Sequence, residues 1–352
     1  MKSVKDCIIQ KKILVTCGVG GVGKTTVSAA LAIKAALQGK NAIVITIDPA
    51  KRLATSLGMK SLHHEPTDLT ETLSSAIKKP VAGKFSALIP QSEHSFERLV
   101  RSLTNSETLI KRILSNPILS TVTQEYSGAN EYLALEELSY VEALQKYDLI
   151  ILDTPPSRNT LSFLSAPQTL SRFFEEKLIR WLVLPTNKLF AGGMKKVFGI
   201  LENLAGQGFL KTLIDFGEAM IEVQDTFLTK LQKIHALLKS TNTGFILVSS
   251  SNPDNAEELS HFLQQVRAQK YSFEGVVLNR SLGHLKNTQN EYSQEQAVRV
   301  IEQLIERESQ AERILKHHLS PELFFTKLPE LSRDVHGLED LVYVSEHFDM
   351  HY

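Results

Sequence analysis

The chain has little of several features, and each shortage excludes a class of protein. Its 352 residues include only two cysteines, Cys7 and Cys17, whose spacing fits neither a zinc site nor a disulfide framework. It contains no run of about 18 apolar residues, and its first residues lack the apolar core of a signal peptide. Basic and acidic side chains number 39 each, so no overall charge attracts nucleic acid or an anionic membrane. We therefore expect a cytoplasmic protein with no structural zinc, no integral membrane segment and no nucleic-acid partner.

Short runs rich in valine, isoleucine and leucine recur along the chain and predict the strands of a sheet. They occupy residues 12–17, 41–47, 147–153, 243–250, 274–279 and 322–328, with a weaker candidate at 84–90. Most runs are apolar throughout, which is typical of strands that are covered on both faces. Because helical stretches separate these runs, we expect an α/β fold with a mostly parallel central sheet flanked by helices.

Two long segments show helical periodicity without a strand candidate. Residues 93–146 read as helical with a break at Asn116-Pro117, and residues 168–240 place apolar residues three and four apart. The pattern predicts an all-helical subdomain inserted into the α/β core. The predicted core comprises residues 1–92, 147–167 and 241–352, and the predicted helical subdomain comprises residues 93–146 and 168–240.

A glycine-rich stretch follows the first predicted strand and opens a helix. Gly18, Gly23, Lys24 and Thr25 match the spacing of a phosphate loop, in the strand-to-helix context which that motif requires. Glycines let successive backbone N–H groups point inward around a polyphosphate, at a helix N-terminus that already favours anions. The alternative is a glycine-rich turn that holds no ligand.

The phosphate-loop reading assigns a role to each residue of the loop. The predicted nucleotide-binding residues are Gly20, Gly21, Val22, Gly23, Lys24, Thr25 and Thr26. Lys24 would meet the β and γ phosphates and act in catalysis, Thr25 would hold Mg²⁺, and Thr26 would lie near the α-phosphate.

Two further strands end in aspartate. Asp153 follows four apolar residues, and Asp48 follows the run "VITI". Since ligands of open α/β sheets lie at the carboxyl ends of strands, we expect Asp153 at the metal and Asp48 at the attacking water. Each also has a plain alternative, because Asp153 could cap the next turn and Asp48 could form a turn before Pro49.

The chain resembles the MinD-related ATPases with a deviant phosphate loop, and among them the family of the arsenite-pump ATPase ArsA and the guided-entry ATPase for tail-anchored proteins. The matching stretches are "GVGGVGKTT", "TIDPAKRLATSLG", "LDTPPSRNTLSFLSAP", "GVVLNR" and "LPELSRDVHGLEDL". The resemblance implies a P-loop NTPase that uses ATP and Mg²⁺. It implies that Asp48 activates water at a first switch and that Asp153 opens a second switch. It also implies that Asn279 reads the adenine edge and that the loop from Pro329 covers the base. Asn279 could equally be a strand-end cap.

Three departures from the family pattern matter for function. The signature lysine, which in relatives reaches across a dimer to the partner's phosphates, corresponds to Val19 here. The arsenite-binding and zinc-clasp cysteines of relatives are missing. Arg158 adds a cation to the second switch, where it would either compensate for the lost lysine or pair with an acidic neighbour.

The sequence therefore predicts an ATP-hydrolysing dimeric switch ATPase in which nucleotide state moves the helical subdomain. Because of Val19, we expect slow hydrolysis by the chain alone, in a homodimer or in a heterodimer with a paralogous ArsA-like subunit. The alternative is a regulatory subunit that binds nucleotide without hydrolysing it. The aromatic-rich helical insertion could be a packed core or subunit contact, or it could hold an apolar client helix or a small ligand.

Overall fold

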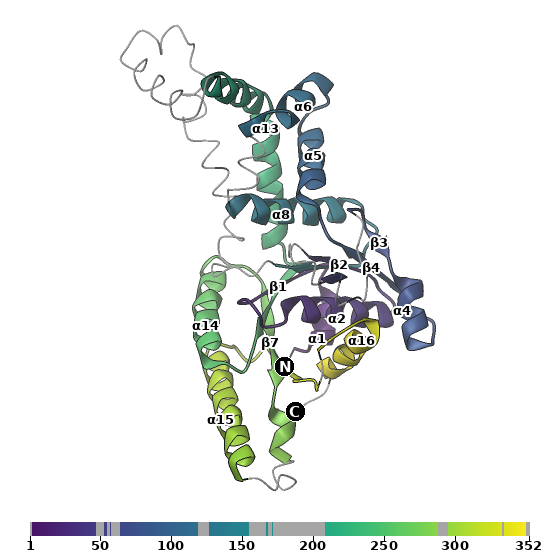
Figure 1. Cartoon of the computed structure of the whole chain (residues 1–352), viewed down its shortest axis with the longest axis vertical. Coiled ribbons are helices and arrows are strands. Elements are labelled where there is room, and N and C mark those ends of the chain that lie inside the picture. Colours follow the sequence, from purple (N-terminus) through teal and green to yellow (C-terminus); the bar gives the residue numbers. More distant parts are fainter. Residues whose placement is uncertain are drawn as a thin grey trace, which may run out of the picture. The chain divides into compact units, whose positions relative to one another are not determined.

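The fold is described from a computed structural model of the chain, whose course is shown in Figure 1. The structure describes residues 2–46, 53–54, 57, 64–118, 127–154, 167, 171, 208–287, 295–332 and 334–349. The chain divides into two compact units. The first comprises Met1–Pro90, Glu137–Leu161 and Leu237–Tyr352, and the second comprises Gln91–Glu136 and Ser162–Ala236.

The first unit is built on one sheet of eight strands, in the order β3-β4-β2-β5-β1-β6-β7-β8. The strands are β1 (Ile13–Cys17), β2 (Asn41–Thr46), β3 (Thr67–Asp68), β4 (Lys84–Leu88), β5 (Leu149–Asp153), β6 (Thr243–Ser249), β7 (Phe273–Ser281) and β8 (Phe324–Pro329). Neighbouring strands are parallel except for β3 and β4, which are antiparallel. The predicted fold class, a mostly parallel sheet flanked by helices, is confirmed.

The central strands are buried because helices cover both faces of the sheet. Every residue of β1, β5 and β6 is buried, which agrees with their uninterrupted apolar sequences. All seven predicted strands are present, including the weaker candidate at 84–90. The pattern missed β3, because two residues on the edge of a sheet are too few to show a period.

Helices flank the sheet on both sides (Figure 1). The helices of the first unit are α1 (Val4–Gln10), α2 (Lys24–Leu37), α4 (Thr70–Ile77), α14 (Pro253–Ala268), α15 (Glu295–His317) and α16 (Leu338–Glu346), with 3₁₀ turns η1 (Gly283–Asn287) and η3 (His347–Asp349). Helix α2 lies against β2 and β5 and also contacts α16, while α14 packs on α15. The alanine-rich sequence of α2 lets it approach the sheet closely, and Gly39 follows its end with a left-handed φ of 91°.

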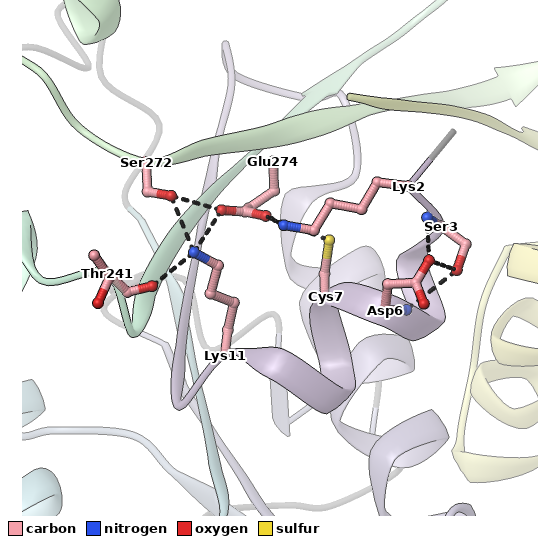
Figure 2. A network of polar contacts seen from close by, with 8 residues as sticks. All are labelled: Lys2, Ser3, Asp6, Cys7, Lys11, Thr241, Ser272 and Glu274. Atoms are coloured by element: carbon pink, nitrogen blue, oxygen red, sulfur yellow. Dashed lines mark hydrogen bonds and ion pairs between the residues drawn. The ribbon is translucent and has the colours of Figure 1, made fainter. Parts of the chain in front are cut away.

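A buried carboxylate attaches α1 to the edge of the sheet where β1 and β7 begin (Figure 2). Glu274 accepts hydrogen bonds from the ammonium groups of Lys2 and Lys11 and, at 2.8 Å, from the hydroxyl of Ser272. The thiol of Cys7 lies 3.7 Å from the same carboxylate. Burial opposes ionisation of Glu274, but the hydrogen bonds from Lys11, Lys2 and Ser272 outweigh it and hold its pKa below the ordinary value. This network lies at the opposite edge from the glycine-rich loop.

The second unit consists of helices in the residues that the structure describes. They are α5 (Ser92–Leu103), α6 (Glu107–Leu114), and parts of α8 (Ser127–Ala143) and α13 (Phe209–Lys239), two helices within which the unit boundaries fall. Arg112 on α6 donates to Asp215, Glu218 and Glu222, which are spaced three and four apart on α13. These ion pairs connect α6 to α13.

Several aromatic residues and one methionine of the predicted helical insertion lie outside the described residues. They are Phe173, Phe174, Trp181, Phe190, Met194 and Phe198. On α13, Met220 is buried and Phe216 is half-buried.

Candidate functional site

The glycine-rich loop connects the end of β1 to the start of α2. Gly21 and Gly23 have φ angles of 81° and 88°, and Gly23 is the N-cap of α2. A Cβ atom on Gly23 would lie 2.2 Å from Nδ2 of Asn279, so a side chain there needs Asn279 to move. A Cβ atom on Gly18 would lie 2.3 Å from the carbonyl oxygen of Val248. The loop therefore needs glycine for its backbone angles and for its close approach to β6 and β7.

The tip of the loop faces solvent, while its neighbours are anchored. Gly20 and Gly21 are exposed, Val22 is buried, and Thr26 is half-buried in the first turn of α2. Exposed backbone amides between buried anchors can meet a ligand without reorganising the fold.

Lys24 is the first residue of α2, and its side chain folds back over the loop. Its ammonium donates to the carbonyl oxygens of Gly18 at 2.8 Å and Val19 at 2.9 Å. The residue is only 6% exposed, so a full positive charge is held close to the loop. An anion bound to the loop would meet both this ammonium and the N-terminus of α2.

Thr25 and Asp153 meet at the carboxyl edge of the sheet. The hydroxyl of Thr25 donates to Oδ2 of Asp153 at 2.6 Å, and the hydroxyl of Thr46 donates to the same oxygen at 2.7 Å. Asp153 is 1% exposed at the end of β5, between the ends of β1 and β2. The structure thus brings together the two residues that we predicted at the metal.

These groups have the chemistry that Mg²⁺ requires. Hydroxyl and carboxylate oxygens are the hard ligands that this ion prefers, and it is commonly held by one or two such groups together with phosphate oxygens. Thr25 and Asp153 therefore fit a nucleotide-bound Mg²⁺. In the part of the chain that the structure describes, no cluster of three or more His, Cys, Asp or Glu residues could hold a metal by itself.

Thr46 is a site residue that the sequence analysis missed. It is the last residue of β2, directly before the stretch "IDP". The rule that ligands gather at the carboxyl ends of parallel strands would have selected it along with Asp153. Its hydroxyl helps to fix the carboxylate of Asp153.

Asn279 lies near the end of β7 and contacts the loop directly. Its side-chain amide donates to the carbonyl oxygen of Val22 at 2.9 Å, and the residue is 8% exposed. Pro329 ends β8 and lines a cavity of about 520 Å³ together with Leu331, Tyr343 and His347. Asn279 and Pro329 thus lie near the ends of neighbouring parallel strands, although Asn279 does not line the cavity.

The thiol of Cys17, beside the loop, is buried. Cys17 ends β1, and burial raises its pKa to about 12 although the nearby Lys24 ammonium favours the thiolate. Cys7 lies in α1, and burial together with Glu274 raises its pKa to about 12 as well. Neither thiol has the accessible, lowered-pKa environment of a reactive cysteine.

The comparison with known proteins decides the family. A family model described as anion-transporting ATPase, of the ArsA type, matches residues 11–349. This chain belongs to the anion-transporting ATPase family. The resemblance inferred from the sequence is therefore confirmed at the level of the family.

Two relatives of this anion-transporting ATPase family member share about a quarter of their aligned residues with it. The chain is 24% identical over 280 residues to a putative arsenical pump-driving ATPase of Chlorobaculum tepidum, covering 79% of this chain and 63% of that protein. It is 27% identical over 273 residues to ATPase ASNA1 homolog 1 of Paramecium tetraurelia, covering 75% and 73%. The chain thus spans less than two thirds of the length of the Chlorobaculum protein.

Two residues that the family resemblance singles out, Asp48 and Arg158, lie outside the described residues. Their expected roles at the two switches stay predictions. Among the helices that the structure describes, none in this anion-transporting ATPase family member is both long and apolar enough to cross a membrane.

Proposed function

We propose that this chain binds ATP with Mg²⁺ on the loop 18–26 and hydrolyses it. The observation that carries the proposal is the meeting of Thr25 with Asp153, at 2.6 Å, beside the Lys24 ammonium and the glycine-rich loop. A hydroxyl and an ammonium at one helix N-terminus, beside a carboxylate at the end of β5, provide the groups that a metal-bound triphosphate requires. Membership of the ATPase family supports the same reading.

Each group at the loop has a distinct role in this proposal. Backbone amides from Gly20 to Gly23 hold the phosphates, and Lys24 neutralises charge on the β and γ phosphates. Thr25 ligates Mg²⁺, while Asp153 fixes the ion's position. When bound, the ion draws charge from the phosphate oxygens and so lowers the barrier to transfer.

We assign preparation of the attacking water to Asp48. It lies two residues after Thr46, whose hydroxyl is held by Asp153 at the metal-binding edge. A carboxylate at this point can accept the proton of a water aimed at the γ-phosphate. We assign recognition of the base to Asn279 and to the loop that begins at Pro329.

Hydrolysis and binding measurements on three variants test the proposal. Lys24→Ala should abolish measurable heat of Mg·ATP binding in calorimetry, because the ammonium provides the only side-chain charge assigned to the phosphates. Asp48→Asn should keep ATP affinity but lose at least about 100-fold in turnover, the usual contribution of a positioned base. Lys12→Ala is the matched control, since Lys12 precedes β1 and pairs with Glu142 at 3.0 Å, away from the loop. Equal binding by Lys24→Ala and the control would refute the proposal.

A second candidate function is favoured by Val19. Its side chain carries no charge, and only its carbonyl oxygen engages Lys24. Loss of a cationic finger costs about 10³ to 10⁵ in turnover in related chemistry. We therefore infer that the chain hydrolyses ATP slowly when it is alone. In this proposal a paralogous subunit completes the site in a dimer, and the nucleotide state moves the helical unit.

A concentration series separates the two candidates. Brisk hydrolysis that stays first order in protein, from a species that sizing shows to be a monomer, would refute the need for a partner. A non-hydrolysing regulatory subunit predicts instead that Asp48→Asn changes no rate. Purification from the native host with identification of the co-eluting chain tests the paralogous partner.

Arsenite is not the ligand that we propose, although relatives carry names that refer to arsenicals. The chain has only two cysteines, and both are buried. They also lie in different elements, Cys7 in α1 and Cys17 at the end of β1.

A further inference from the structure

The end of β7 is irregular directly after Asn279. Arg280 has a left-handed φ of 59°, and the pairing of β7 with β8 shifts its register between Leu278 and Ser281. A residue other than glycine in this conformation is held by its surroundings rather than by its own preference. Some other group must therefore hold this strand end in place.

That group is the carboxylate of Glu308 on α15, which is 2% exposed. One of its oxygens accepts from the hydroxyl of Ser281 at 2.7 Å, and the other accepts from the backbone N–H of Leu282 at 2.6 Å. The ammonium of Lys327 on β8 lies 3.2 Å from it and balances its charge. The carboxylate thus holds the irregular turn at two adjacent residues.

Ser281 connects the turn held by Glu308 to the end of β8. Its hydroxyl accepts from the N–H of Gly283 at 3.2 Å, and its carbonyl oxygen accepts from the N–H of Glu330 at 2.9 Å. Ser281 lies two residues after Asn279, and Glu330 directly follows Pro329. One buried network therefore links the strand ends that carry the two residues assigned to the base.

We propose that Glu308 is a positioning residue that sets Asn279 relative to Pro329 and so determines the preference of the site for adenine. The inference rests on the proposed ATP-binding function and extends it to base selectivity. Buried ion pairs are weak sources of stability but can enforce one arrangement of neighbouring groups. At the irregular end of β7, beside the predicted base site, the Glu308 network would hold Asn279 in one position.

Glu312 provides a matched control. It lies one turn further along α15 and pairs with the same Lys327 and with Lys316, but it has no hydrogen bond to the β7–η1 turn among those that the structure describes. Glu308→Gln and Glu312→Gln therefore make the same chemical change on the same helix, and only the first acts on Ser281 and Leu282.

The test measures the affinities of the full chain for Mg·ATP, Mg·GTP and tripolyphosphate by calorimetry. Glu308→Gln should lower the preference for ATP over GTP by about tenfold, the effect of one hydrogen bond to a charged group. Affinity for tripolyphosphate should change less than about twofold, because the phosphate loop is untouched, and Glu312→Gln should keep the wild-type preference. A general loss of stability would move all three affinities together.

Other outcomes overturn the inference. A folded Glu308→Gln protein with wild-type preference refutes it, as does a wild-type protein that binds ATP and GTP equally. If Glu308→Gln does not fold, Ser281→Ala replaces it, and an unchanged preference in that variant refutes the inference. Failure of the wild type to bind ATP at all refutes the proposed function instead.

Discussion

The close approach of the glycine-rich loop to β7 makes Gly23→Ala a sharp test of the site's geometry. A methyl group at Gly23 would lie 2.2 Å from the amide nitrogen of Asn279, whereas a methyl group at Gly21 would meet nothing within 4 Å. Both glycines have left-handed φ angles, 88° and 81°. The two substitutions therefore share the same backbone strain and differ in the collision with Asn279.

The size of each effect follows from this difference. Placing alanine in the left-handed region costs roughly 1–2 kcal/mol of unfolding free energy, so Gly21→Ala should cost about 1 kcal/mol. Gly23→Ala should cost about 1–3 kcal/mol more, because Asn279 must move and give up its buried hydrogen bond to Val22. In an Asn279→Ala background the collision is gone, and the cost of Gly23→Ala should fall to that of Gly21→Ala.

Urea unfolding without nucleotide, followed by circular dichroism, measures these values for the four variants. The double-mutant cycle between Gly23 and Asn279 should give a coupling of at least about 1 kcal/mol. Equal costs for the two glycine substitutions, or a coupling near zero, would show that the loop does not lie against β7 as described.

Two further predictions concern the opposite edge of the sheet and the thiols. Glu274→Gln should lower the free energy of unfolding by about 3 kcal/mol, because Lys11 is left as a buried charge. Glu142→Gln should lower it by under about 1 kcal/mol, because the ion pair between Glu142 and Lys12 is partly exposed. The pKa of Glu274 is lowered on folding, so its ionised form stabilises the folded state. This stabilisation is fully present when the pH is above the ordinary pKa of 4.5, and it is lost as the pH falls through the lower pKa of the folded state. Urea midpoints measured from pH 7 down to 3 should fall further in wild type than in Glu274→Gln, in which the other carboxyl groups still titrate. With pKa values of about 12, Cys7 and Cys17 should resist a thiol reagent at pH 8 in the native protein and react fully in urea, and rapid native labelling would contradict their burial.

The strands and the phosphate loop could be predicted because their signals are local. A strand covered on both faces needs apolar residues at every position, and this pattern marked β1, β5 and β6. The loop could be predicted because the spacing of Gly18, Lys24 and Thr25 reflects a backbone shape within ten residues. The edge strand β3 could not, since two residues show no period.

The sequence by itself determined that a glycine-rich loop follows the first buried strand and that Asp153 ends another, because these features depend on neighbours along the chain. Only the tertiary structure decided that Thr46 shares the carboxylate of Asp153 with Thr25, and that Glu308 holds the turn beyond Asn279. Strand order sets which carboxyl ends lie side by side, and a carboxylate from α15 reaches β7 only when that helix packs on the sheet. These contacts join residues from 26 to 128 positions apart, where no local periodicity carries information.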